Sequence, residues 1–503
     1  MMGRRVTLMA SAWTAVLLAG CTAVGPNYHR PEIATPAAYE GVPNNRLSAD
    51  RGDLSQWWRQ FDDPVLQGLV DRALAGNFDL EAAASRIRQA RLQVILAGAA
   101  GLPTLNADPS ATHEHISKNA FPPGFESLFG GGGGASSSPP VFALPGSGIS
   151  IYQLGFDASW EIDVFGGVRR SVEAARADAE AAVWSHRAAE VTLAAEVASD
   201  YFELRAAQQR VAIYQAEITR QKGLLELISD RRKVQVATSL DTDRQQVQIA
   251  DATARLPAVE ADARVQVHAL GVLLGQPPEA LGAELAASAP PPPPPPVVPA
   301  GLPSDLLERR PDVRQAERQF AAANARIGVA TAELYPKFTL TGSAGLVSTA
   351  LSSLISSASR QYSGTAAINW PLLDGGRAHA DIKVAREQAR QAELAYRNAT
   401  LMALKDVEDA LTRYAADQAQ GQSLRQSLEA SQRALTISQQ RYQVGLVDYS
   451  DVLNSEAGVL SAQDQIAQTD ASLSRDLVSL YKALGGGWDA HDLEAEATAR
   501  APG

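Results

Sequence analysis

Hydrophobic and polar residues alternate with two different periods along this chain, and both periods return in its second half. Residues 71–97 place apolar side chains at helical spacing, and the pattern stops before Gly101 and Pro103, which are typical of a helix end. Farther on the period becomes two, as in a strand with one apolar and one polar face. The apolar positions of four such segments are Leu105, Ala107 and Ala111; Tyr152, Leu154, Phe156, Ala158, Trp160 and Ile162; Phe338 and Leu340; and Tyr362, Ala366, Ile368, Trp370 and Leu372. This pattern predicts four amphipathic strands, two in each half.

A long helical region follows each pair of strands. It covers roughly residues 168–234 in the first half and 377–444 in the second, with apolar residues at the three- and four-residue steps of a heptad-like seam. Each region then turns and returns as another helix, over residues 241–274 and 451–484. Such antiparallel pairs expose too much surface to be stable singly, so we expect them to pack against neighbours. A filamentous coiled-coil protein is the alternative, but it leaves the strand pairs unexplained.

An internal duplication accounts for these paired elements. Landmarks that lie 210 residues apart are Trp160 and Trp370, Asp241 and Asp451, and Leu274 and Leu484. Upstream, Pro103 and Pro336 are 233 residues apart, so the first copy carries 23 extra residues. These coincide with a Gly- and Ser-rich stretch between Phe121 and Ser138, which has the composition of a flexible loop. A run of prolines from Pro290 to Pro296 separates the copies and must be an extended linker.

The four predicted strands have the length and the one-sided apolarity of transmembrane β-strands. Trp160, Trp370, Tyr152 and Tyr362 lie on the apolar faces, where the aromatic girdle of an outer-membrane barrel would lie. An amphipathic hairpin packed on a soluble core is the alternative. No later stretch has the roughly 18 consecutive apolar residues of a transmembrane helix, so a membrane crossing would have to use strands in a closed barrel. The smallest outer-membrane barrels use about eight strands, so we expect the chain to oligomerise.

The N-terminus has the features of a lipoprotein leader. Two arginines precede an apolar run over residues 6–18, and the sequence Leu-Ala-Gly-Cys that ends at Cys21 resembles a bacterial lipobox. In that case residues 1–20 are removed, and Cys21 becomes the first mature residue with a covalent diacylglycerol and an N-acyl chain. Thr22, in place of an aspartate, favours the outer membrane over the inner one. An ordinary secretory leader with an incidental cysteine is the alternative.

Composition and charge exclude several functions. The 503 residues carry a net charge of −11 without a basic patch, which argues against nucleic acid as a partner. The one cysteine excludes an intrachain disulfide. His113 and His115 lack a third metal ligand, and the chain has no phosphate-binding Gly-x-x-x-x-Gly-Lys loop. We therefore expect no metal site, no cofactor and no catalytic centre, so that a partner must supply the energy for any transport.

Several motifs carry a family resemblance. They are Leu306-Leu-Glu-Arg-Arg-Pro-Asp312, Gly25-Pro26-Asn27-Tyr28, Trp57-Trp58 and Val444-Gly445-Leu446. With them the chain resembles the outer membrane factors of tripartite efflux systems, of the TolC, OprM and NodT type. The resemblance implies a mixed α and β membrane protein: a homotrimer in which four strands per protomer form one outer-membrane β-barrel, continued by a long periplasmic α-helical barrel with an equatorial domain.

The resemblance also implies partners, a location and a division of the chain. The partners are a periplasmic adaptor (a membrane fusion protein), an inner-membrane resistance–nodulation–division (RND) transporter and outer-membrane lipid. The chain would be anchored by lipid in the outer membrane, with most of it in the periplasm. The expected segments are a signal peptide (1–20), an anchored N-terminal segment (21–60), repeat 1 (61–275, with its strands at about 103–164), an equatorial linker (276–304), repeat 2 (305–485, with its strands at about 336–372) and a tail (486–503).

Adaptor docking is implied at the two helix turns, residues 231–243 and 441–454. Val444, Gly445 and Leu446 match the family's docking motif, where glycine permits a close backbone approach. The first-copy counterparts are Val234 and Val236, which flank Gln235 instead of a glycine. This makes the first turn the less certain docking site.

A gate is implied at the same turns. Tyr442 matches the family's gating tyrosine and Asp241 its carboxylate partner, so we expect the two to hydrogen-bond in the closed state. The family's second gating link does not carry over, because its positions hold Val447 and Leu240. Asp451 matches an acidic residue that rings the aperture, and three copies of it would favour cations.

Two channel functions of the same fold remain open, together with a third possibility, a protein that forms no channel. The first is passive exit for drugs, toxic small molecules or metal ions that an RND transporter delivers. The alternative is the exit duct of a type I protein secretion system. A lipoprotein scaffold that forms no channel would show no conductance, and an enzyme has no supporting residues.

Overall fold

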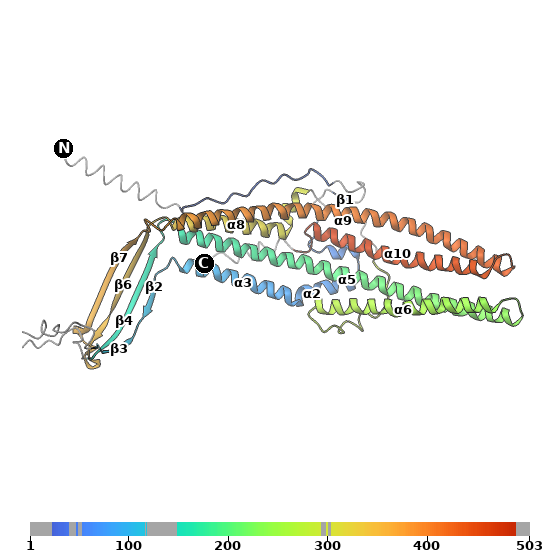
Figure 1. Cartoon of the computed structure of the whole chain (residues 1–503), viewed down its shortest axis with the longest axis horizontal. Coiled ribbons are helices and arrows are strands. Elements are labelled where there is room, and N and C mark those ends of the chain that lie inside the picture. The colour runs from blue at the N-terminus through green and yellow to red at the C-terminus, as the bar shows by residue number, and fades with distance from the viewer. Residues whose placement is uncertain are drawn as a thin grey trace, which may run out of the picture. The chain divides into compact units, whose positions relative to one another are not determined.

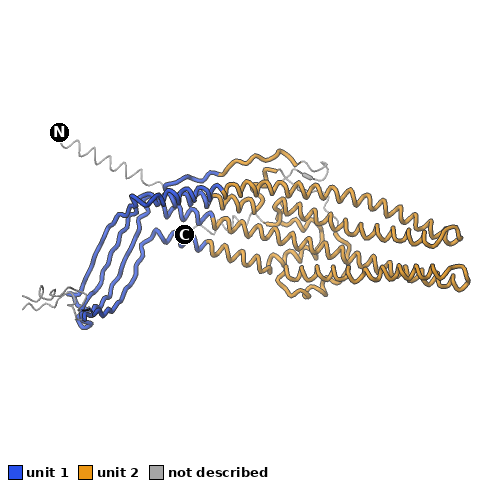
Figure 2. The backbone as a smooth tube through the Cα atoms, in the orientation of Figure 1, with its two compact units in different colours: residues 1–29, 91–177, 321–390 blue, residues 30–90, 178–320, 391–503 orange. Residues whose placement is uncertain are grey.

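The computed structural model describes residues 23–39, 47–48, 53–115, 117, 148–292, 298–299 and 303–488. The chain divides into two compact units, shown in Figure 2. Unit 1 consists of residues 1–29, 91–177 and 321–390, and unit 2 consists of residues 30–90, 178–320 and 391–503. The predicted leader, Cys21, the Gly- and Ser-rich loop and most of the predicted C-terminal tail lie outside the described residues.

Unit 1 contains an antiparallel sheet with the strand order β2-β4-β6-β7 (Figure 1). Its strands are β2 (Thr104–Ala107), β3 (Ser110–His115), β4 (Gly148–Ile162), β6 (Lys337–Ser348) and β7 (Arg360–Asn369). Both β2 and β3 pair with β4 in one register, with Ala107 opposite Phe156 and Ser110 opposite Gln153. The alternation over residues 105–114 predicted a single strand, and the structure corrects this: the strand is interrupted at Pro109, which has no N–H for the ladder.

The sheet has one apolar and one polar face, as the alternation predicted. Directly paired rows on the apolar face are Ile162, Phe338 and Ile368; Trp160, Leu340 and Ala366; and Phe156, Ala344 and Tyr362. Rows on the other face are polar, for example Ser159, Thr341 and Thr365. Phe156, Ile368 and Tyr362 are all more than half exposed within this chain. An apolar face of this length needs a hydrophobic environment to cover it.

The four long helices begin and end close to their predicted positions. They are α5 (Gly167–Lys233), α6 (Ser239–Leu273), α9 (Arg377–Gln443) and α10 (Tyr449–Ala483). A capping box between Thr238 and Asp241 explains where α6 starts, since each residue satisfies a backbone N–H of the other. None of the described helices combines the length and the apolarity needed to cross a membrane.

The predicted helix over residues 71–97 proves to be two helices, α2 (Pro64–Gly76) and α3 (Phe78–Ala99). Asn77 separates them because its Oδ1 accepts hydrogen bonds from the N–H groups of Asp79 (2.9 Å) and Leu80 (3.1 Å) and so caps α3. The second-copy counterparts are α7 (Leu306–Arg309) and α8 (Pro311–Ala332). Short elements are the strands β1 (Leu47–Ser48) and β5 (Val298–Pro299) and the 3-10 helices η1 (Trp57–Phe61), η3 (Pro303–Asp305), η4 (Leu351–Ser353) and η5 (Ser357–Ser359).

The duplication is visible in contacts as well as in element lengths. Helices α5 and α9 both have 67 residues, and α6 and α10 both have 35. In unit 1, Trp160 Nε1 donates to the carbonyl of Gly101 (2.9 Å), and Trp370 Nε1 donates to that of Leu334 (3.0 Å). These tryptophans are 210 residues apart and their acceptors 233 residues apart, the two spacings found in the sequence. The same bond is thus built twice, which confirms the internal repeat.

The core of unit 2 is aromatic. Trp57 stacks on Tyr481 with ring centroids 5.0 Å apart, and Phe61 packs against Phe202 at 5.0 Å. Trp57 and Phe61 come from η1, Phe202 from α5 and Tyr481 from α10, so segments from both ends of the chain close on one core. The short parallel pair of β1 and β5 joins the N-terminal segment to the proline-rich linker.

In unit 1 the segment that follows the predicted lipidation site is held by a buried arginine. Arg170, in the first turn of α5, donates to the carbonyls of Val24 (3.0 Å) and Gly25 (3.2 Å) and to Oδ1 of Asn27 (2.8 Å). The N–H of Val24 donates to the carbonyl of Phe165 (3.0 Å). Residues 23–27 are therefore fixed beside the turn that joins β4 to α5.

Candidate functional site

The two predicted helix turns have nearly the same backbone geometry. We refer to α5 and α6 as hairpin 1 and to α9 and α10 as hairpin 2. In hairpin 1 the N–H of Val236 donates to the carbonyl of Arg231 (2.9 Å), and in hairpin 2 the N–H of Leu446 donates to that of Arg441 (2.9 Å). The residue just before each donor, Gln235 (φ +62°) or Gly445 (φ +72°), is left-handed. Both turns thus end a helix with the left-handed cap that glycine normally supplies.

Replacing Gln235 by glycine should stabilise the protein by about 0.5–1 kcal/mol. The left-handed conformation costs a residue with a Cβ about 1–2 kcal/mol, and the greater freedom of glycine in the unfolded chain offsets part of that gain. Gly445→Gln is the mirror-image control and should destabilise the protein, because it introduces the same strain. The midpoint of thermal unfolding of the purified protein measures both. Shifts in the same direction for the two variants would contradict the account.

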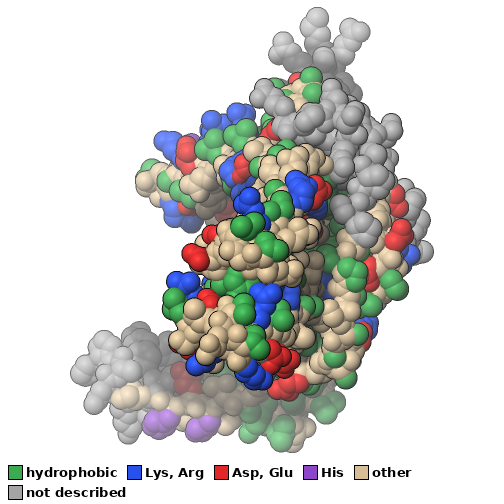
Figure 3. Space-filling model, turned by 90° about the vertical axis from the view of Figure 1, so that its right-hand side faces the viewer, with side chains coloured by type: hydrophobic (Ala, Val, Ile, Leu, Met, Phe, Trp, Pro, Cys, Tyr) green, Lys and Arg blue, Asp and Glu red, His purple; other side chains and the backbone are tan. Residues whose placement is uncertain are grey.

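Apolar side chains project from both turns. Val234 and Val236 of hairpin 1 are 69% and 70% exposed, and Val444 and Leu446 of hairpin 2 are 70% and 72% exposed. Figure 3, which looks at the end of the molecule where these turns lie, shows hydrophobic side chains at the surface among basic and acidic ones. Exposed pairs of this kind, placed on a rigid turn, are suited to contact with another protein.

The gating residues predicted at the turns lie near each other but have other partners. The carboxylate of Asp241 accepts hydrogen bonds from the N–H (2.9 Å) and the hydroxyl (2.8 Å) of Thr238. The ring of Tyr442 lies 5.1 Å from that of Tyr449 and 5.4 Å from the guanidinium carbon of Arg231. Burial raises the pKa of Tyr442, and the negative charge of Asp241 adds to this shift. The direct Asp241–Tyr442 hydrogen bond is absent from this conformation of the described residues, and its formation in a closed state stays a prediction.

Asp451 lies in the first turn of α10 with an exposed side chain. Its N–H donates to the carbonyl of Asp448 at 3.1 Å, and its own carbonyl accepts from Ser455 Oγ at 2.8 Å. Asp451 therefore presents an exposed carboxylate beside the turn of hairpin 2.

The register spreads the four predicted girdle aromatics along the sheet, since Trp160 is opposite Leu340, Tyr362 is opposite Ala344 and Tyr152 is opposite Ser348. Trp160 and Trp370 lie where the strands join the helical segments, with the indole N–H groups bonded to backbone carbonyls. Tyr152 and Tyr362 each lie eight residues away along the same chain segments, on the same face. At roughly 3.4 Å per residue, the tryptophan and the tyrosine of each segment are about 27 Å apart along the strand, close to the roughly 25 Å height of the apolar band of a membrane barrel.

The two histidines set aside above lie near the far end of the sheet. His113 is opposite Ser150, and its Nδ1 is 3.0 Å from the serine hydroxyl. Within the described part of the chain, no group of three or more histidine, cysteine or acidic side chains could hold a metal ion.

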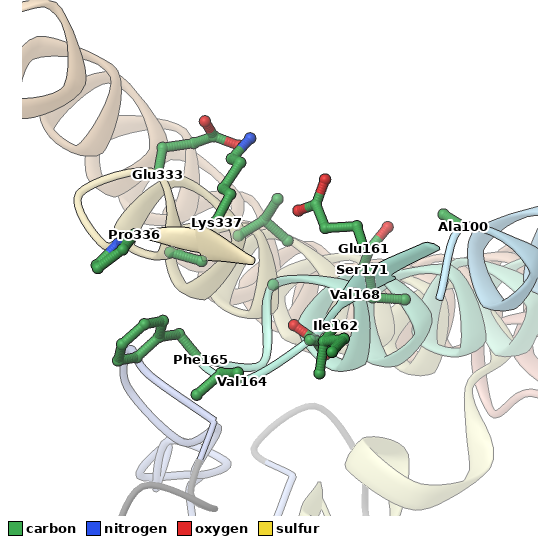
Figure 4. A pocket seen from close by; sticks show the side chains of 14 residues that line it. Ala100, Glu161, Ile162, Val164, Phe165, Val168, Ser171, Glu333, Pro336 and Lys337 are labelled. Atoms are coloured by element: carbon green, nitrogen blue, oxygen red, sulfur yellow. The ribbon is translucent and has the colours of Figure 1, made fainter. Parts of the chain in front are cut away.

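A cavity of about 220 Å³ lies in unit 1 where the strands meet the helices (Figure 4). Its polar lining includes Glu161, Glu333 and Lys337, and Lys337 donates to Glu333 at 2.8 Å. Phe165, also in the lining, stacks on Tyr335 with ring centroids 4.6 Å apart. Lining residues come from β4, α5, α8 and β6, so the cavity marks the place where these elements meet.

A one-sided apolar sheet joined to long helical hairpins defines an outer-membrane channel protein. The chain belongs to the Outer membrane efflux protein family, which matches it over residues 69–276 and 302–486. It is 33% identical over 477 residues to the pyoverdine export outer membrane protein OpmQ of Pseudomonas aeruginosa, covering 94% of this chain and 96% of that protein. It is 30% identical over 494 residues to the probable outer membrane lipoprotein SilC of Salmonella typhimurium, covering 95% and 98%.

The fold is shared with a solved structure of the same class. The outer-membrane channel OprN superposes with a TM-score of 0.80 at 33% identity, covering 92% of this chain and 99% of that one. The TolC-like fold, the efflux function and the outer-membrane location expected from the sequence are therefore confirmed.

Proposed function

We propose that three copies of this chain form a duct through which small molecules or metal ions, delivered by an inner-membrane RND transporter through a periplasmic adaptor, leave the cell without covalent chemistry. The carrying observation is the sheet: its apolar face is uncovered, and its outer strands β2 and β7 each pair with only one strand among the described residues. Pairing with the strands of neighbouring copies in a closed barrel would satisfy the hydrogen-bonding groups of the strand edges. The lipid around that barrel would cover the apolar face.

The cargo follows from the relatives rather than from a binding site. OpmQ is named for pyoverdine export, and a second relative, 30% identical over 486 residues, is named for antibiotic efflux. A passive duct needs no pocket complementary to its cargo, so the pump would select the substrate. Transport of a protein by a type I system is the alternative, and identification of the inner-membrane partner that co-purifies with the chain distinguishes the two.

Lipidation of Cys21 completes the proposal. The hydrogen bonds of Arg170 to residues 24–27 support it, because they fix the segment that directly follows Cys21. The acyl chains on Cys21 would then be attached near the junction of strands and helices. Trp160 and Trp370 lie at that same junction. Aromatic side chains with a bonded N–H favour the membrane–water interface, so the acyl chains and the girdle would enter the bilayer at one level.

The test of the channel is conductance of the purified full-length protein in planar lipid bilayers. Discrete conductance steps, together with an oligomer that resists dissociation in detergent, are expected. A protein that inserts into the bilayer without any conductance would leave a scaffold as the function.

Loosening the turns should raise that conductance. Tyr442→Phe combined with Asp241→Ala removes the proposed hydroxyl–carboxylate link of the closed state. If that link contributes about 1.4 kcal/mol, the open state becomes about tenfold more populated. The mean current per channel measures the change, with Tyr481→Phe as a control because its hydroxyl bonds to Gln60 (2.7 Å) in the core of unit 2. An unchanged current in the double variant would reject this gate.

Asp451 should set the ion preference of the duct. Three carboxylates around one aperture attract cations and repel anions. Asp451→Asn keeps the shape of the side chain but removes its charge, so the reversal potential in a salt gradient should move toward that of a non-selective pore. Asp448→Asn, three residues earlier in the same turn, is the charge-matched comparison. A shift of equal size in both variants would assign the effect to overall surface charge.

A further inference from the structure

A buried polar cluster lies between the two hairpins, close behind their turns. Its members come from hairpin 1 (Arg220 and Gln221 on α5, Gln245 on α6) and hairpin 2 (Tyr449 and Glu456 on α10). Apart from Arg220, each is no more than 3% exposed. Polar groups at this depth must find partners within the protein, since water does not reach them.

The hydrogen bonds of this cluster cross repeatedly from one hairpin to the other. The hydroxyl of Tyr449 donates to Oε1 of Gln245. Gln221 Nε2 donates to Oε2 of Glu456 (3.1 Å), and Arg220 Nη1 donates to Oε1 of the same carboxylate (2.5 Å). Three hydrogen bonds, two of them to the Glu456 carboxylate, therefore join hairpin 1 to hairpin 2 within one protomer.

Bonds inside hairpin 1 hold the crossing groups in place. Gln245 Nε2 donates to the backbone carbonyl of Gln221 (2.9 Å), which orients its oxygen toward Tyr449. Arg220 also bonds to Glu217 (2.7 Å), and Gln221 Nε2 bonds to that carboxylate as well (2.5 Å). One cation thus serves two carboxylates, and each glutamine serves as both donor and acceptor.

The cluster is continuous with the gating tyrosine. The ring of Tyr449 is 5.1 Å from that of Tyr442, and Tyr449 packs with Ile228, Val452 and Leu453 in a small apolar core behind the turns. A displacement of Tyr442 therefore acts directly on Tyr449, the first residue of α10.

Separating the hairpins would leave buried polar groups without their hydrogen-bond partners. Glu456 is 1% exposed, and burial raises its pKa even though Arg220 and Gln221 favour the charged form. A carboxylate in such a site loses its partners when hairpin 2 moves, and an unpaired buried charge is far less stable than a paired one. The cluster is therefore satisfied only while the two hairpins stay together.

We propose that Gln245, Tyr449 and Glu456 form a latch that holds hairpin 2 against hairpin 1 and thereby keeps the periplasmic end of the duct narrow, in addition to Tyr442. This inference rests on the proposed channel function. It assigns a role to three residues of each protomer that lie behind the turns rather than on their exposed surface.

Two conservative variants test the latch in planar bilayers. Tyr449→Phe removes the donor to Gln245 but keeps the ring and its packing, and Glu456→Gln removes the charge but keeps the shape. Each should raise the open probability about tenfold, the effect of losing about 1.4 kcal/mol from the closed state. Tyr481→Phe is the matched control, because it also removes the hydroxyl bond of a buried tyrosine, to Gln60, but in the core of unit 2. It should lower the thermal stability and leave the conductance unchanged.

The outcomes separate the latch from the channel. A higher open probability in both variants with a normal control supports the latch. A lower open probability in both variants would mean that the cluster stabilises the open form of the duct, and it would overturn the latch. If the two variants lose thermal stability as Tyr481→Phe does while their conductance stays that of the unmodified protein, the cluster is only a packing feature and the latch is wrong. An absence of conductance in every protein, including Tyr442→Phe with Asp241→Ala, would overturn the channel function and the latch with it.

Discussion

Arg310→Ala should lower the thermal unfolding temperature of this protein by roughly 3 °C, the effect of about 3 kcal/mol in a chain of 503 residues. Arg310 is 8% exposed and its guanidinium bonds to Asp312 (2.7 Å) and Asp406 (3.0 Å). It also donates to the backbone carbonyl of Ala483 (3.2 Å) at the end of α10. Removing the buried guanidinium leaves the carbonyl of Ala483 and two carboxylates, which are 45% and 41% exposed, without their shared donor. This loss is larger than that of an ion pair whose two side chains are both exposed.

The control for this prediction is an exposed ion pair of the same length. Arg72 bonds to Glu284 at 2.7 Å, but the two side chains are 40% and 46% exposed. Arg72→Ala should therefore cost at most about 1 kcal/mol. Arg310→Lys adds a second comparison, because lysine keeps the charge but cannot span two carboxylates and a carbonyl with a planar fork. Equal losses for Arg310→Ala and Arg72→Ala, read from thermal unfolding monitored by circular dichroism, would contradict the assigned role.

The role of Arg310 illustrates what the sequence could predict and what it could not. The Arg309-Arg310-Pro311-Asp312 motif marks the family, and Pro311 marks the start of a helix. The second copy of Asn77 is Arg310, however, and a short amide has become a long guanidinium that reaches the same place: Asn77 donates to Leu273 at the end of α6 (2.9 Å) as Arg310 does to Ala483. That equivalence depends on which helix ends lie next to each other in the fold. The spacing of residues along the sequence does not give this information.

Elements governed by local periodicity were predicted well. The four long helices and the alternating strands were found because each carries many repeats of one period, and the duplication supplied an independent check. The errors lie where one residue overrides its surroundings. Asn77 splits a helical pattern by capping α3, and Pro109 interrupts the pairing of an otherwise alternating strand.

Only those residues of the candidate site that match motif positions of the family could be predicted from the sequence. Tyr442, Asp241 and the turn residues follow from motif positions, and the structure places all of them at the helix turns. The partners that Asp241 and Tyr442 make here, Thr238 and Arg231, were not predicted. The Tyr449–Gln245 bond joins residues 204 positions apart, and neither residue belongs to a recognisable motif. Contacts between distant helices depend on packing, so such a cluster leaves no local signal.

Replacing both apolar residues of the second turn by aspartate, Val444→Asp with Leu446→Asp, should weaken adaptor docking at least about 30-fold and abolish the resistance that the efflux system confers. Buried apolar anchors at interface centres are each worth about 2 kcal/mol or more, and burying a carboxylate in their place adds a desolvation cost. Both side chains are about 70% exposed in the free chain, so the substitutions should not disturb folding. Co-purification of the adaptor from native membranes and the minimal inhibitory concentration of a pumped compound measure the two effects.

The first turn offers a matched comparison, because Val234 and Val236 are exposed to the same extent on the same backbone geometry. Val234→Asp with Val236→Asp should weaken docking less, since Gln235 occupies the position where Gly445 allows a close backbone approach. Conductance of both variants in planar bilayers should stay normal, which separates docking from gating. If adaptor capture and resistance survive in the Val444 and Leu446 variant while its conductance is unchanged, these turns are not the docking surface, and the adaptor must contact the helices elsewhere.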